Sequence, residues 1–94
     1  MSAAPEYLNP QPALRDRLLG LVEQILGRPG ASRTVPVDAR LSEVGINSIQ
    51  MVNLMIAAEV EFDISIPQNE ITPDNFRSVA SIEALIARLL ALKP

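Results

Sequence analysis

The chain has no cysteine and no histidine among its 94 residues. It therefore lacks thiolates, imidazole bases and the usual zinc and copper ligand sets, which removes most side-chain catalytic mechanisms. Its length and its 48% hydrophobic content suffice for one compact domain with a single core. We expect a protein that is not an enzyme, with no catalytic residue and no metal site.

The sequence also has no long apolar runs and no basic clusters, and we expect no leader segment. No apolar stretch approaches the length of a bilayer span, and no basic cluster suits nucleic acid. The first ten residues show neither the basic nor the apolar region of an export signal. We expect a cytoplasmic protein that has soluble protein partners, no nucleic-acid partner and no membrane span.

The net charge of −3 is unevenly distributed. Residues 38–76 contain seven acidic residues and one arginine, whereas the segments on either side are slightly basic. A field of this sign attracts basic patches on partner proteins, but charge alone favours a solvated acidic surface.

Apolar spacing of helical type predicts an all-α fold. We expect helices at residues 12–26, 48–62 and 78–92, with a flexible tail at 1–10 and one domain over 11–94. Gly27 ends the first helix, Ser78 or Ser81 caps the last, and residues 73–76 form a short turn after Thr72. The long connection over residues 28–46 needs anchors, for which the candidates are Val37, Leu41, Val44 and Ile46.

The helix predicted over residues 48–62 has two apolar stripes. The first, which we assign to the core, consists of Met51, Leu54, Met55, Ala58 and Phe62. The second consists of Ile49, Val52, Ile56 and Val60. A surface helix needs only one such stripe, so the second indicates either burial on two sides or an exposed docking surface.

A serine lies at the start of this helix, in the segment Gly45-Ile46-Asn47-Ser48-Ile49. Asn47 or Ser48 suits an N-cap, whose side-chain oxygen accepts a backbone N–H. The same position also suits a covalently attached phosphate, because free amides and the helix dipole stabilise an anion there. A hydrolase nucleophile is excluded on the usual mechanism, because the chain has no histidine to serve as its base.

The segments LSEVGINSIQMVNLMIAAEVEFDISIP and NFRSVASIEALI resemble the acyl and peptidyl (aminoacyl) carrier proteins, a phosphopantetheine-binding family. The resemblance implies a four-helix bundle with a long loop between helices one and two and a short third helix. It implies that a transferase attaches 4′-phosphopantetheine from coenzyme A to Ser48, with Asn47 and Ile49 beside it. It also turns the second stripe toward partners, so the implied partner-binding residues are Ile49, Val52, Ile56, Glu59 and Val60.

Several positions differ from the usual pattern of this family. Asn47 replaces an aspartate, Gln50 and Asn53 replace acids, and Val60 replaces a frequent glutamate. The expected partner surface is therefore more apolar, and a partner that requires many acids matches it less well.

We therefore predict a monomeric carrier of an acyl or aminoacyl thioester in a specialised pathway. A ligase loads it, and downstream acyl-transferring enzymes take the cargo. The alternatives are an acyl carrier of primary fatty acid synthesis and, from another class, an unmodified helical adaptor in which Ser48 only caps the helix.

Overall fold

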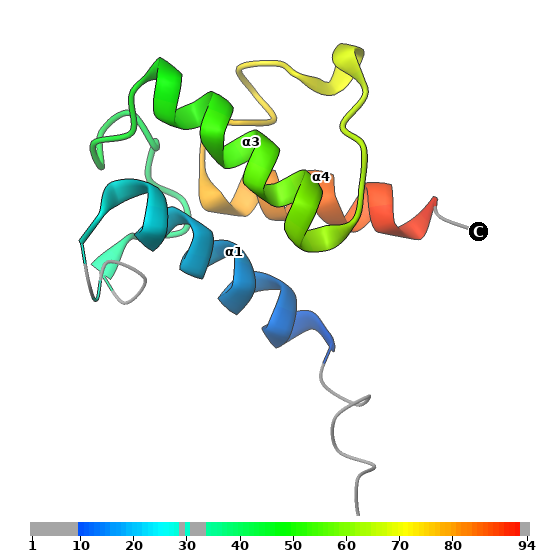
Figure 1. Ribbon diagram of the computed structural model, residues 1–94, viewed down its shortest axis with the longest axis horizontal. Helices are drawn as coiled ribbons and strands as arrows, with labels where there is room; N and C mark the ends of the chain where they lie inside the picture. The colour runs from blue at the N-terminus through cyan, green and yellow to red at the C-terminus, as the bar shows by residue number, and fades with distance from the viewer. Residues whose placement is uncertain (1–9, 29, 31–33, 93–94) are drawn as a thin grey trace, which may run out of the picture.

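The computed structural model describes residues 10–28, 30 and 34–92. They form the α-helices α1 (Pro10–Leu26), α3 (Ser48–Phe62) and α4 (Val79–Ala91), and the 3₁₀-helix η2 (Gln68–Glu70) (Figure 1). α1 packs against both α3 and α4, and it runs antiparallel to α3. No strand occurs in these residues, and the predicted all-α class is confirmed.

The helix boundaries follow local signals in the sequence. α3 begins and ends at the predicted residues, and α4 starts after the predicted N-cap Ser78, which forms a reciprocal capping box with Ser81. α1 begins at Pro10, two residues earlier than predicted. A first turn accepts proline because its N–H groups have no acceptor within the helix. Most of the predicted tail, residues 1–9, lies outside the described residues.

The long connection between α1 and α3 is attached to the start of α4 by backbone hydrogen bonds. The Leu41 N–H donates to the Arg77 carbonyl at 2.8 Å, and the Ala80 N–H donates to the Val37 carbonyl at 2.9 Å. The predicted anchors of this connection are all buried or packed against the core: Val37, Leu41, Val44 and Ile46. Val35 is also buried and was not predicted.

The segment between α3 and α4 differs from a regular short third helix. Residues 73–76 form the predicted turn, in which the Thr72 hydroxyl oxygen accepts from the Asn75 N–H at 3.2 Å. The only other regular element of this segment is η2, and the described residues thus form three α-helices and a 3₁₀-helix rather than four α-helices. Pro67 and Pro73 bracket η2 and remove two backbone donors, so they leave room for little more than one turn.

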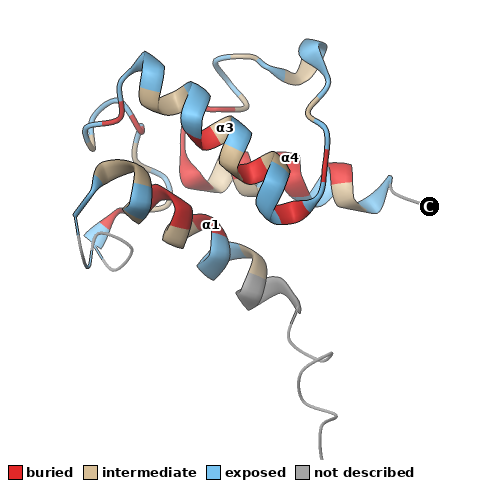
Figure 2. Ribbon diagram, in the orientation of Figure 1, coloured by how far each residue is buried: buried red, intermediate tan, exposed pale blue. Residues whose placement is uncertain are grey.

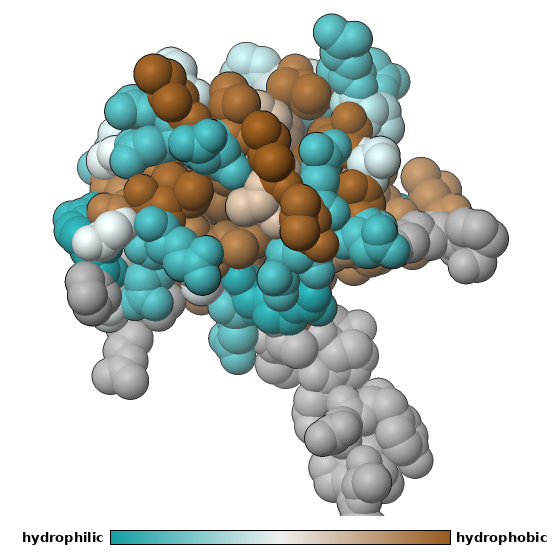
Figure 3. Space-filling view, viewed as in Figure 1, coloured by the Kyte–Doolittle hydropathy of each residue, from teal (hydrophilic) through white to brown (hydrophobic). Residues whose placement is uncertain are grey.

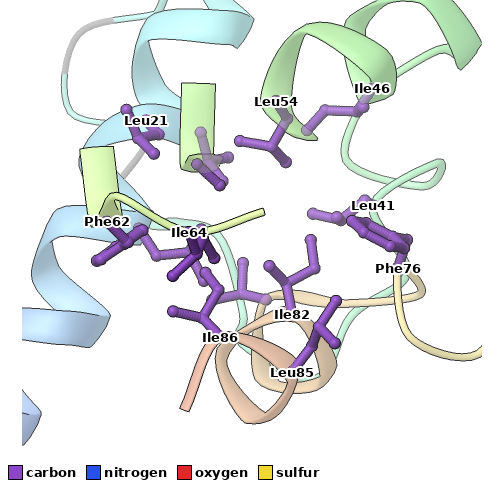
Figure 4. Packing of buried hydrophobic residues seen from close by; sticks show 14 of the residues in the cluster. Leu21, Leu41, Ile46, Leu54, Phe62, Ile64, Phe76, Ile82, Leu85 and Ile86 are labelled. Atoms are coloured by element: carbon purple, nitrogen blue, oxygen red, sulfur yellow. The ribbon is translucent and has the colours of Figure 1, made fainter. Parts of the chain in front are cut away.

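The core lies between the three α-helices. Figure 4 shows Leu54 of α3, Leu21 of α1 and Ile82 of α4 directed toward a common interior. Leu54, Ala58 and Phe62 are buried, and the Met51 and Met55 side chains pack against the same cluster. The first stripe is therefore confirmed as the core side of α3 (Figure 2).

Candidate functional site

The N-terminus of α3 is closed by a capping box of two neutral side chains. Asn47 is the N-cap, and its side-chain oxygen accepts from the Gln50 N–H at 2.8 Å. In return, the Gln50 side-chain oxygen accepts from the Asn47 N–H at 3.0 Å. Of the two cap candidates, Asn47 is therefore the cap, and the Ser48 hydroxyl is not needed for this purpose.

Ser48 is the first residue of α3, and its side chain is exposed. Its hydroxyl and the N–H groups of Ser48 and Ile49 have no hydrogen-bond partner within residues 10–28, 30 and 34–92. They lie at the positive end of the helix dipole. An accessible hydroxyl with unpaired amides beside it fits a covalent phosphodiester, which needs both attachment and charge stabilisation.

Two side chains attach this turn to the end of α1. The Gln50 amide nitrogen donates to the Ile25 carbonyl at 3.3 Å, and the Arg28 guanidinium donates to the Val44 carbonyl at 2.8 Å. Gly45, which directly follows Val44, has a φ of 105°, which residues with a side chain rarely adopt. The role of Gln50 was not predicted, although its place three residues after an Asn cap is the signal for a capping box.

A hollow of about 450 Å³ opens directly beside Ser48. Its apolar lining comes from Ile46, Met51, Pro73 and Phe76, and its polar lining includes Asn47 and Ser42. Arg40 and Arg77 also line it, together with Asp74, whose carboxylate pairs with Arg77 at 3.0 Å. Only Asn47 and Ser48 of these residues were predicted as part of a site.

The second apolar stripe of α3 is exposed rather than buried on a second side. The exposed fractions are 74% for Ile49, 48% for Val52, 54% for Ile56 and 78% for Val60. Figure 3 shows these side chains as a diagonal row of hydrophobic surface that follows α3 across the molecule. Of the two interpretations left open by the spacing, burial on two sides is therefore excluded.

Glu59 and Glu61 lie near the C-terminal end of this row, and both make contacts within the chain. The half-buried Glu59 accepts a hydrogen bond from the Ile66 N–H at 2.8 Å, which holds the segment that follows α3. Glu61 pairs with Arg17 of α1 at 2.7 Å. The structure thus gives Glu59 a structural contact that the sequence did not reveal, and its contact with a partner stays a prediction.

Other kinds of site are not found in the part of the chain that the structure describes. No helix there has both the length and the apolar character needed to cross a membrane. Within the same residues, no group of three or more acidic side chains is arranged to hold a metal ion.

These features define a class of protein. An all-α domain presents a serine at a helix N-terminus, with unpaired amides, a hollow beside it and an exposed apolar helix face. This combination is that of a carrier domain, which bears a covalent group and docks to other proteins. Residues 16–89 match the family described as "Phosphopantetheine attachment site", and the chain belongs to this family.

Named relatives support the same assignment. Aminoacyl carrier protein 1 of Bradyrhizobium diazoefficiens is 45% identical over 73 residues, which cover 78% of this chain and 81% of the relative. Aminoacyl carrier protein 2 of the same organism is 42% identical over 77 residues, which cover 82% of this chain and 86% of the relative.

Similar chains are also found in two crystal structures of the Bradyrhizobium japonicum glycine:[carrier protein] ligase, each solved as a complex with a carrier protein. In the complex with glycylated carrier protein, the similar chain has 46% identity and a TM-score of 0.63, over 76% of this chain and 96% of that chain. In the complex with the cognate carrier protein and an analogue of glycyl adenylate, the similar chain has 44% identity and a TM-score of 0.66, over 79% of this chain and 96% of that chain.

The family assignment confirms the predicted function in its general form. The protein is a carrier and not an enzyme, and it holds an acyl or aminoacyl group on a covalent 4′-phosphopantetheine arm. The arm supplies a thiol, so a chain without cysteine can hold a thioester. The unmodified adaptor is disfavoured by this assignment.

Proposed function

We propose that Ser48 is the residue that carries the phosphopantetheine arm, with Asn47 and Ile49 beside it at the attachment site. The observation that carries this proposal is the exposed hydroxyl next to two unpaired N–H groups at the start of α3. A magnesium-dependent phosphopantetheinyl transferase catalyses the attachment. The serine oxygen bonds to a phosphorus of coenzyme A, the bond from that phosphorus to adenosine bisphosphate breaks, and the hydroxyl proton goes to a base on the transferase.

The proposed cargo is an amino acid, and glycine is the first candidate. This rests on the names of the relatives and on the ligase complexes that contain the similar carriers. A ligase of that type loads the arm, and downstream acyl-transferring enzymes receive the aminoacyl group in a specialised pathway. Primary fatty acid synthesis is the weaker candidate, because Asn47, Gln50 and Asn53 stand where its partners expect acids.

The exposed row on α3 is the proposed partner surface. It consists of Ile49, Val52, Ile56 and Val60, with Glu59 beside it. Large apolar side chains grouped on one face of a soluble domain mark an interaction surface more often than scattered ones do. The row begins one residue after Ser48, so a partner seated on it lies close to the arm.

We further propose that residues 11–94 act as one monomeric domain in the cytoplasm. Coenzyme A, which supplies the arm, and ATP, which forms an aminoacyl adenylate, are substrates of that compartment. Size-exclusion chromatography with light scattering tests the monomer, and expression of residues 11–94 alone tests the domain boundary.

Intact mass measurement tests the attachment site. Wild-type protein incubated with coenzyme A, magnesium and a broad-specificity transferase should gain the mass of one phosphopantetheine group. Ser48→Ala should gain nothing and should keep its helical circular dichroism, because Asn47 and Gln50 still cap the helix. Modification of Ser48→Ala would place the arm elsewhere, and an unmodified wild type would favour the helical adaptor.

The cargo is tested on the modified protein. Incubation with glycine, ATP and the glycine:[carrier protein] ligase should add one glycyl group, which hydroxylamine then removes because thioesters react with it. Alanine and a fatty acid with its own ligase serve as competing substrates. Loading with the fatty acid but with neither amino acid would overturn the aminoacyl proposal and support the fatty acid alternative.

A further inference from the structure

Asn53 is a polar side chain within the exposed apolar row of α3. It follows Ile49 by four residues and precedes Ile56 by three, so on the helix it lies between these two side chains. Asn53 is itself exposed, and its side-chain amide makes no hydrogen bond with the residues that the structure describes. The amide therefore keeps its donors and its acceptor available for a partner.

The other polar side chains of α3 differ from Asn53 in this respect. Gln50 closes the capping box at the start of the helix. The Glu59 carboxylate accepts a backbone N–H from the segment after α3, and the Glu61 carboxylate pairs with an arginine of α1. Apart from Ser48, Asn53 is thus the polar side chain of α3 that makes no contact of this kind within the described part of the chain.

The apolar side chains of the row do not by themselves fix the position of a partner along α3. Ile49 and Ile56 are identical and seven residues apart, which is almost two full turns of the helix. A partner displaced by about 10 Å along the helix therefore meets the same type of side chain again. Asn53 breaks this repetition. In coiled coils, a single asparagine among apolar contacts specifies the register in the same way.

From this arrangement we infer that Asn53 fixes the register in which the loading ligase docks on α3. The ligase surface that covers the row presents apolar side chains around one amide group, from a side chain or from the backbone, and this group pairs with the Asn53 amide. The inference rests on the proposed function of the row as the partner surface. It adds a hydrogen-bond requirement to that surface, so Asn53 is a positioning residue that determines specificity.

Burial of the row makes this requirement strict. A partner that covers Asn53 removes water from its amide, and a buried amide without a hydrogen-bond partner is unfavourable. A partner in a shifted register, or one with only apolar side chains at this point, leaves the amide unpaired and binds less well. An amide differs from a carboxylate here because it offers donors as well as an acceptor and has no charge to attract a basic residue.

Asn53 is also close to the proposed attachment site of the arm. It follows Ser48 by five residues, which corresponds to about 7–8 Å along the helix axis. A ligase held in register at Asn53 therefore has its active site at a fixed position relative to the attachment point. A slip along the row would misplace the thiol, and a small misplacement of a reacting group slows its reaction strongly. The register should thus affect the loading step more than the binding step.

The loading kinetics of Asn53→Leu test the inference. Each protein is first modified with the arm and verified by intact mass, and glycine loading by the ligase is then measured as kcat and as KM for the carrier. In Asn53→Leu, kcat should fall at least about fivefold while KM falls or stays within about twofold, because the apolar contact persists without its register. Gln24→Leu is the matched control. It makes a similar change at an exposed position of α1 and should leave both constants unchanged.

A second variant, Asn53→Asp, tests which group of the ligase pairs with this position. Aspartate has the same shape but no amide donors, so loading should fall in this variant as well. Faster loading of Asn53→Asp at low salt would place a basic group there and overturn the amide pair.

The outcomes for Asn53→Leu separate the inference from the function on which it rests. Normal loading of the wild type with an unchanged kcat in Asn53→Leu would overturn the inference alone. A raised KM with an unchanged kcat would also overturn it, because Asn53 would then contribute affinity and not register. A modified wild type that the ligase does not load would instead contradict the proposed function, and the inference would fall with it.

Discussion

The two apolar faces of α3 have similar composition and opposite surroundings. Leu54, Ala58 and Phe62 on one face are 1%, 2% and 5% exposed, while Ile56 and Val60 on the other are 54% and 78% exposed. One face packs against α1 and into the core cluster, and the other is largely exposed. Periodicity thus identifies apolar faces, but only the packing of other elements decides which of them is core.

The largest effect is expected on the buried face. Leu54→Ala and Phe62→Ala should each lower the free energy of unfolding by about 2–5 kcal/mol, because each leaves a cavity that the core fills only in part. Urea unfolding followed by circular dichroism measures this. Ile56→Ala is the matched control on the exposed face, and its effect should stay within about 0.5 kcal/mol. Equal losses of stability in Leu54→Ala and Ile56→Ala would show that the two faces of α3 do not differ in their contribution to the core.

A smaller loss of stability is expected from a change at the start of α3, in the capping box of Asn47 and Gln50. Gln50→Ala removes one half of the capping box and the bond to the Ile25 carbonyl, so it should cost about 0.5–2 kcal/mol. Gln50→Glu retains the capping oxygen and should recover part of this. Modification of Ser48 by the transferase should also slow in Gln50→Ala. Unchanged unfolding and modification would show that the turn does not depend on Gln50.

On the exposed face, Ile56→Glu should change stability by less than about 0.5 kcal/mol and leave modification possible. Loading by the cognate ligase should nevertheless fall sharply, because docking would now desolvate a charge. The loss should persist at high salt, where purely electrostatic contacts are already screened. A collapsed melting temperature would instead show that Ile56 supports the core, and unaffected loading would remove Ile56 from the partner surface.

The smallest effect is expected at Glu59. Glu59→Gln keeps an oxygen that accepts from the Ile66 N–H, so it removes the charge while it retains the structural contact. Loading should change little, and any change should disappear at high salt. Glu59→Ala, which loses the contact as well, should be the less stable of the two variants. A strong, salt-resistant loss of loading in Glu59→Gln would give this carboxylate a direct role in docking.

The sequence predicted the features that depend on neighbouring residues. The bounds of α3, the cap at Ser78 and the turn after Thr72 follow from side chains within a few positions of one another. The all-α class and the core stripe follow from spacing along single helices. The family resemblance supplied the arm, and the attachment to Ser48 stays a prediction.

What the sequence did not reveal depends on contacts between distant segments. The hollow joins Arg40 to Arg77 across the fold, and no local pattern pairs these positions. The same holds for Arg28 at the Val44 carbonyl. The η2 helix was missed for another reason, since a helix of three residues is too short to show a helical period.

The hydrogen bonds of Gln50 to the Ile25 carbonyl and of Arg28 to the Val44 carbonyl have a consequence for local unfolding. Gln50 connects the turn before α3 to Ile25 in the last turn of α1, and Arg28, two residues after α1 ends, connects it to the Val44 carbonyl, so opening of the turn breaks both bonds. Native-state hydrogen exchange should therefore show one cooperative unit, in which the amides at the end of α1 and those at the start of α3 share an opening free energy. Local unfolding of the segment that contains Ser48 should therefore depend on the stability of the end of α1.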